Sequence, residues 1–83
     1  MITLPTIHSN GTSRITLQRD YDAAAEALET FAQAWTAIEF NARDYYPQGE
    51  SAWTQARQLR EEHSANLRRI RNYLETIREH LYS

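Results

Sequence analysis

The sequence predicts an all-α protein, an antiparallel hairpin of two long helices that follows an irregular N-terminal arm. Three observations predict this fold. Two long stretches have helical apolar spacing, Pro47 and Gly49 interrupt the segment between them, and Asn10-Gly11 is a turn signal before the first stretch. We expect the arm at residues 1–12 and the hairpin at 13–83, with helices at about 13–43 and 51–82 and a loop at about 44–50.

The first helix should begin directly after the arm. Thr12 or Ser13 is the expected N-cap, because a hydroxyl there can accept a hydrogen bond from an unpaired N–H of the first turn. Apolar side chains then alternate at spacings of four and three: Leu17, Tyr21, Ala24, Leu28, Phe31, Trp35, Ile38 and Ala42. This spacing is a heptad seam. The helix should end near Arg43 to Tyr45, since Pro47 disfavours α conformation at the residue before it.

The second helix should begin at Ser51, which is the expected N-cap. Its apolar positions drift from a strict heptad toward the ordinary helical period: Ala52, Ala56, Leu59, His63, Leu67, Ile70, Leu74, Ile77 and Leu81. Two helices enclose little, and the 83 residues include no cysteine that could staple a small core. We therefore expect a dimer that forms a four-helix bundle, or a higher oligomer.

Charge is divided unequally between the two helices, although the net charge is only −2. Residues 16–42 carry one arginine against five acidic residues, whereas residues 51–82 carry six arginines against four glutamates. One stripe of the second helix contains Arg57, Arg60, Arg68, Arg71 and Arg78. Such a stripe could follow a phosphate backbone, but the interrupting glutamates disfavour nucleic-acid binding. Pairing with the acidic first helix explains the arginines better.

No early apolar run resembles a signal peptide, because Pro5 interrupts the first residues, and no later run is long enough to span a bilayer. We therefore expect a cytoplasmic protein without a membrane partner.

The connecting segment carries more recognition chemistry than a turn requires. Its polar and aromatic side chains are Asn41, Arg43, Asp44, Tyr45, Tyr46 and Gln48. Tyrosine offers a stacking face and arginine a planar fork of donors, so these residues could hold a nucleotide-like ligand. The alternative is structural: Arg43 and Asp44 pair locally while the two tyrosines cover the open end of the bundle.

The arm provides a second candidate site at His8, Asn10, Thr12 and Ser13. The first N–H groups of the helix, with His8 beside them, could bind an anion. The alternative is that Asn10 makes a turn and Thr12 caps the helix. The two motifs flank the first helix and should lie some 40 Å apart in a hairpin. They meet only if the arm runs back along the bundle or an antiparallel second subunit brings its loop to the arm.

Two stretches together resemble a known family. Ile7 to Ser13 reads IHSNGTS, and Asn41 to Gly49 reads NARDYYPQG. They are similar to the pattern IHxNGTS followed by NxRDYYxQG in small, uncharacterised proteins of phages and prophages. The resemblance implies a mobile-element accessory protein that acts in a bacterial cytoplasm and counters host defence.

The function expected from these features is non-enzymatic: binding and sequestration of a small phosphorylated, nucleotide-like ligand by a homo-oligomer. A module that inhibits a host enzyme through its acidic helix and exposed aromatics is the alternative. A third reading is a HEPN-like ribonuclease, because Arg57 and His63 have the Arg-x5-His spacing of that class. His63 lies on the apolar seam, which favours a structural role. We expect no metal site and no cofactor, since no ligand cluster or glycine-rich phosphate loop is present.

Overall fold

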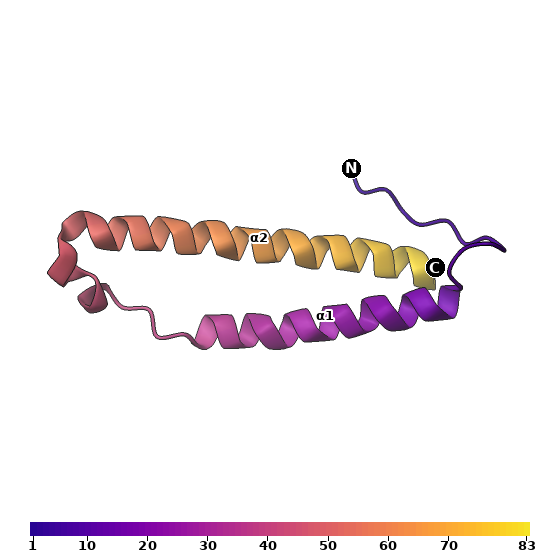
Figure 1. The fold of residues 1–83 in the computed structure, drawn as a ribbon, viewed down its shortest axis with the longest axis horizontal. Helices are drawn as coiled ribbons and strands as arrows, with labels where there is room; N and C mark the ends of the chain where they lie inside the picture. Colours follow the sequence, from indigo (N-terminus) through magenta and orange to yellow (C-terminus); the bar gives the residue numbers. More distant parts are fainter.

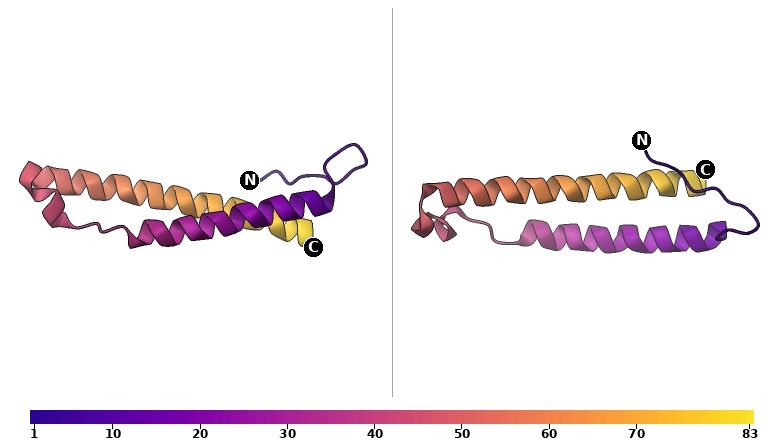
Figure 2. Two further views of the ribbon diagram at one scale, coloured as in Figure 1. Left: turned by 60° about the horizontal axis from the view of Figure 1, so that its bottom comes forward. Right: turned by 45° about the horizontal axis from the view of Figure 1, so that its top comes forward.

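The computed structural model describes residues 1–83 and confirms an all-helical hairpin. Helix α1 spans Arg14–Ala37 and helix α2 spans Glu50–Tyr82, and two short 3-10 turns, η1 at Ala42–Asp44 and η2 at Tyr46–Gln48, lie between them. The helices run antiparallel along a rod with principal extents of 60 × 24 × 19 Å (Figure 1). The arm leaves the start of α1 and turns back beside the C-terminal end of α2 (Figure 2).

The predicted start of α1 is confirmed, whereas its predicted end and the predicted cap of α2 are wrong. Ser13 is the N-cap of α1, and its Oγ accepts a hydrogen bond of 3.1 Å from the backbone N–H of Thr16. Helix α1 stops at Ala37, six residues before the expected boundary at Arg43. Helix α2 begins at Glu50 with Gly49 as its N-cap, so Ser51 already lies inside the first turn. Gly49 has φ of 108°, a conformation that residues with side chains rarely adopt.

Packing of Phe40 accounts for the early end of α1. By helical periodicity, a continued helix would put Phe40 on the side of Asp22, where α1 carries its charges. Instead Ile38 leaves the helix with ψ of 128°, and the ring of Phe40 packs 5.0 Å from Trp53 and 5.6 Å from Tyr45, centroid to centroid. Burial of aromatic surface therefore outweighs the few helical hydrogen bonds that a longer α1 would add.

Arg60 of α2 closes this end of α1. Its Nη2 donates a hydrogen bond of 2.9 Å to the carbonyl oxygen of Trp35, in the last turn of α1. Its guanidinium carbon lies 4.8 Å from the Trp35 ring centroid and 4.6 Å from that of Phe40. The same carbonyl also accepts a hydrogen bond of 3.3 Å from the backbone N–H of Ile38. A cation at a helix C-terminus complements the helix dipole, and both rings attract it as well.

An arginine closes the other end of the hairpin in the same way. Arg14 Nη1 and Gln18 Nε2 donate to the carbonyl oxygen of Leu81, in the last turn of α2, at 2.7 and 2.9 Å. The arm joins this end as a third layer, because the carbonyl oxygen of Pro5 accepts a hydrogen bond of 2.8 Å from His80 Nε2. These contacts fix the register of the two helices at the arm end.

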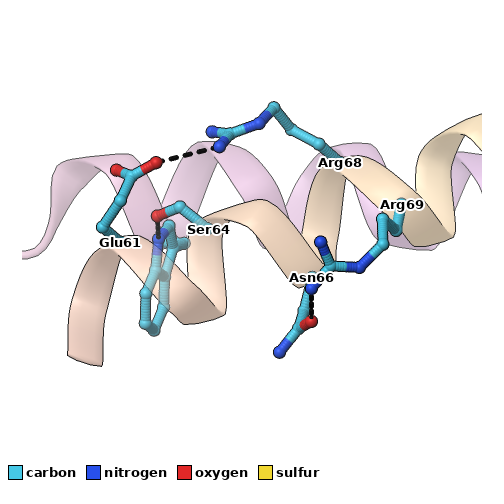
Figure 3. Close-up of polar contacts among 6 residues, drawn as sticks. Glu61, Ser64, Asn66, Arg68 and Arg69 are labelled. Atoms are coloured by element: carbon cyan, nitrogen blue, oxygen red, sulfur yellow. Dashed lines mark hydrogen bonds and ion pairs between the residues drawn. The ribbon is translucent and has the colours of Figure 1, made fainter. Parts of the chain in front are cut away.

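Ion pairs join the helices along one side of the rod, as the charge pattern predicts. Arg78 Nε lies 2.9 Å from Asp22 Oδ1, and Arg71 Nη2 lies 3.5 Å from Glu29 Oε2. Another arginine of the stripe, Arg68, pairs at 2.9 Å with Glu61 of its own helix (Figure 3). These three arginines are therefore satisfied within the chain, and they do not form a free cationic track.

Only Ile77 and Leu81, at the arm end of α2, are buried. Within one chain, Ala24 and Phe31 of the predicted seam are exposed, and Ala25 and Ala32 are shielded instead along the line of contact with α2. Leu59, His63 and Ile70 of the predicted apolar set on α2 are exposed as well. On the side of the rod away from the ion pairs, exposed side chains of both helices form what we call the apolar face. Its members are Ala24 and Phe31 of α1 and Leu59, Ile70 and Tyr73 of α2.

Neither helix has a segment that is long and apolar enough to cross a bilayer.

Replacing Arg60 with Ala should lower the free energy of unfolding by about 2–3 kcal/mol, because one substitution removes the charged hydrogen bond to Trp35 and both ring contacts. Arg68→Ala is the matched control, since Arg68 pairs only with an exposed carboxylate on its own helix and should change stability by less than about 0.5 kcal/mol. Urea denaturation of both variants measures the difference. Equal losses would contradict the clamping role of Arg60.

The Asp22 cluster should make stability depend on pH. The hydroxyl of Tyr82 and then the guanidinium of Arg78 hold the pKa of Asp22 below its ordinary value. The same hydrogen bond from Tyr82 to Asp22 raises the pKa of Tyr82. The stability from Asp22 is thus present above its ordinary pKa of about 4 and is lost as pH falls through the lowered value.

Thermal unfolding of the wild type and Asp22→Asn between pH 2 and pH 7 checks this expectation. The wild type should unfold at the higher temperature at pH 7, and the gap should close as the carboxylate is protonated. A gap that stays constant across this range would show that Asp22 does not act through its charge.

Candidate functional site

The connecting segment, Ile38–Gly49, is held against the hairpin by Tyr45. The rings of Phe40, Tyr45 and Trp53 form a mutually packed triangle, in which the Tyr45 and Trp53 centroids are 5.8 Å apart. The guanidinium carbon of Arg57 lies 5.9 Å from the Trp53 centroid. Tyr45 therefore acts as the predicted structural cap of the open end.

Most of the other candidate residues of this segment project into solvent. Arg43, Asp44, Tyr46 and Gln48 are exposed, and none of their side chains makes a hydrogen bond or an ion pair. The local Arg43–Asp44 pair of the structural alternative is therefore not formed. Asn41 differs, because its Nδ2 donates a hydrogen bond of 3.3 Å to Glu39 Oε2. Of the two adjacent tyrosines, one anchors the segment and the other, 57% exposed, is left free.

An open hollow lies beside the free tyrosine, lined by Tyr46, Glu50 and Trp53. It has two aromatic side chains and one carboxylate, in the first turn of α2. Aromatic rings stack on planar heterocycles, and a carboxylate accepts hydrogen bonds from their N–H groups. Arg43 lies in η1, the short turn before Tyr46. Its planar guanidinium can donate two parallel hydrogen bonds to a phosphate. These residues suit a small planar ligand that carries an anionic group.

The arm residues form a turn and a helix start at the other end of the rod. The N–H of Gly11 donates a hydrogen bond of 3.1 Å to the carbonyl oxygen of His8. The His8 ring lies directly on Gly11, where a Cβ would come within 2.7 Å of Nε2. His8, Asn10 and Thr12 are exposed, and Ser13 rather than Thr12 caps α1.

The arm does run back along α2, but within one chain it does not reach the connecting segment. Ile2 borders a shallow hollow with Ala65, Asn72 and Tyr73, more than a dozen residues along α2 from Glu50. The two candidate motifs consequently stay at opposite ends of a single chain (Figure 1).

Arg57 and His63, the pair considered for a ribonuclease, each contact a different aromatic side chain. Arg57 lies over Trp53, whereas the His63 ring meets Trp35 edge-on with centroids 6.3 Å apart. The Trp35 indole N–H donates to Ser64 Oγ at 3.0 Å, one residue after His63. No group of three His, Asp or Glu side chains is placed to hold a metal ion.

The residues that sequence reasoning missed are Phe40, Trp53 and Glu50. Phe40 and Trp53 build the support for Tyr45, and Glu50 borders the hollow. A signal was present, because Phe40 falls outside the heptad seam and Trp53, one position after Ala52, falls outside the apolar set of the second helix. Two large aromatics that flank a turn at off-seam positions indicate a local cluster at the end of a hairpin.

Comparison with protein-family models, curated proteins and solved structures found no match.

The two adjacent tyrosines should differ sharply in their effect on stability. Tyr45→Ala should lower the free energy of unfolding by about 2–4 kcal/mol, because it removes one ring of the packed triangle. Tyr46→Ala should change it by less than about 0.5 kcal/mol, since that ring has no aromatic partner. Urea denaturation measures both. If Tyr46→Ala proves as costly as Tyr45→Ala, the assignment of anchor and free tyrosine is wrong.

Proposed function

We propose that this chain is a non-enzymatic binding protein, assembled from several hairpins, that holds a small phosphorylated, nucleotide-like ligand at the connecting segment. The observation that supports the proposal is the difference between the two adjacent tyrosines: one is packed and the other is exposed. Tyr45 anchors the segment while Tyr46, Arg43 and Gln48 are left exposed and without partners. Side chains with strong binding chemistry, presented unpaired on a firmly supported turn, are typical of a recognition site.

In this proposal each free group has a separate role. A planar base stacks on Tyr46 and Trp53, and Glu50 accepts a hydrogen bond from an N–H on its edge. Arg43 donates two parallel hydrogen bonds to a phosphate. Bound ligand would be sequestered rather than converted, because the hollow contains no nucleophile with an adjacent base and no metal cluster.

A protein-interaction module remains the second candidate, and the exposed apolar face favours it. The acidic surface of α1, which the sequence indicates as the interaction surface, has less unpaired negative charge than the sequence suggests. Asp22 and Glu29 already pair with arginines of α2, so their charges are partly neutralised within the chain. A host protein would therefore have to be recognised by apolar contact rather than through the acidic helix.

The resemblance to phage and prophage proteins adds a biological setting to the proposal for either activity. A small phage or prophage accessory protein that sequesters a nucleotide signal, or blocks a host enzyme, would counter bacterial defence from within the cytoplasm. This setting rests on the IHSNGTS and NARDYYPQG stretches alone.

Calorimetric titration with a panel of mononucleotides and cyclic nucleotides tests the proposal. For a nucleotide that binds the wild type, Arg43→Ala and Tyr46→Ala should each weaken affinity by at least about tenfold, the loss expected for one charged hydrogen bond or one stacking face. Neither substitution should alter the fold, since both side chains are exposed. The control is Arg19→Ala, an exposed arginine of α1 next to Asp20. Absence of binding across the panel would exclude the nucleotide proposal and favour a protein partner.

A further inference from the structure

The apolar face continues from one helix to the other without a charged break. Its largest members are all substantially exposed: Phe31 at 51%, Leu59 at 52%, Ile70 at 48% and Tyr73 at 43%. Ring contacts connect it across the hairpin, because Phe31 packs 6.2 Å from Trp35, which in turn meets His63 of α2. At the arm end, the hydroxyl of Tyr73 raises the pKa of Tyr21 through a side-chain hydrogen bond.

The arm does not cover this face. Ile2 lies toward Ala65 and Asn72, on the neighbouring side of α2, and its hollow includes only Tyr73 of the apolar face. The ion pairs occupy the opposite side of the rod, where Arg71 and Arg78 meet α1. The face is thus bordered by the arm and by a polar side, and nothing in the chain itself packs on it.

The exposed area indicates how large the missing contact is. The chain exposes 6423 Å², whereas a compact monomer of its 9.7 kDa would expose about 5,100 Å². The excess of about 1,300 Å² exceeds the roughly 800 Å² that each partner contributes to a standard stable interface. The elongated shape and the arm, with Met1 at 123% and Leu4 at 41% exposure, contribute to this excess together with the apolar face.

The two halves of the face are complementary in size. Helix α1 contributes Ala24 and Phe31 with Ala27 and Ala34 beside them, and helix α2 contributes mostly larger side chains. Small positions on one helix accommodate large ones on the facing helix, which is how well-packed cores interdigitate. The ion pairs set the register so that Phe31 lies close to the level of Ile70. Let a second copy be related to the first by a two-fold axis that runs parallel to the rod, beside the apolar face. In this arrangement α1 of each chain lies opposite α2 of the other.

We infer that a second copy of this chain covers the apolar face, with Phe31 of each copy packed against Ile70 of the other in a four-helix bundle. This arrangement buries the face of both copies at once and leaves both connecting segments exposed at the same end. His63 and Asn66 of α2 are exposed between Leu59 and Ile70, and such polar positions in an apolar seam restrict register. The inference is independent of the ligand, because Arg43 and Tyr46 take no part in it.

The mass of the purified chain in solution, measured by light scattering, tests the inference first. The wild type should have at least twice the 9.7 kDa chain mass. Phe31→Glu and Ile70→Arg should each weaken association by at least about 100-fold, because an unpaired charge enters an apolar contact. Ile15→Glu is the matched control, since Ile15 is 74% exposed on the polar side of α1 and should leave the mass unchanged.

Mixing the two face variants makes the test decisive even if each alone unfolds. Phe31→Glu and Ile70→Arg meet across one half of the bundle and form an ion pair there, while the other half keeps its wild-type contacts. The mixture should therefore recover association and helix content by circular dichroism. A monomeric wild type, or a mixture that stays dissociated, would overturn the inference; a monomer would instead leave the face to a protein of the host.

Discussion

The constraint on which this structure depends is that two helices cannot surround a side chain. Each helix covers only one side of its neighbour, so the hairpin alone leaves every position along its contact partly open. The two buried residues, Ile77 and Leu81, lie where the arm adds a third layer at the end of α2. Elsewhere the second copy that we infer would supply a third and a fourth helix. On that inference, assembly completes the core that the hairpin leaves open.

Within one chain, arginines hold together what the small core cannot. Arg60 closes the C-terminal end of α1, and Arg14 closes that of α2, each from the opposite helix. Between them, Arg71 and Arg78 cross to acidic residues of α1. The planar guanidinium can stack on a ring and donate to a carbonyl at the same time, as Arg60 does, which a lysine ammonium cannot reproduce. The absence of lysine from the sequence is understandable on this basis.

The closure at Arg60 also shapes the candidate site. Because α1 stops at Ala37, the chain has twelve residues in which to bring Phe40 and Tyr45 onto Trp53. With the segment supported in this way, Tyr46 and Arg43 are presented at the tip of the rod. The proposed recognition of a nucleotide thus depends on contacts that stabilise the hairpin, and a variant of Tyr45 would affect both.

Periodicity and capping rules predicted the hairpin, an N-cap at Thr12 or Ser13 and the pairing of acidic and basic helices, because these follow from local sequence and charge. They failed where tertiary contacts decide between equal local alternatives. Ala24 and Ala25 are indistinguishable in a run of alanines, so spacing alone could not show which one faces α2. Tyr45 and Tyr46 are equally indistinguishable in sequence, and only packing against Phe40 and Trp53 separates them.

The measurement that most directly tests this account is the dependence of the unfolding temperature on protein concentration. If a second copy completes the core, unfolding is coupled to dissociation, and mass action raises the unfolding temperature as the concentration increases. We expect the temperature to rise steadily between micromolar and millimolar protein. A single cooperative transition at one temperature across that range would show that the hairpin is stable alone and would contradict the account.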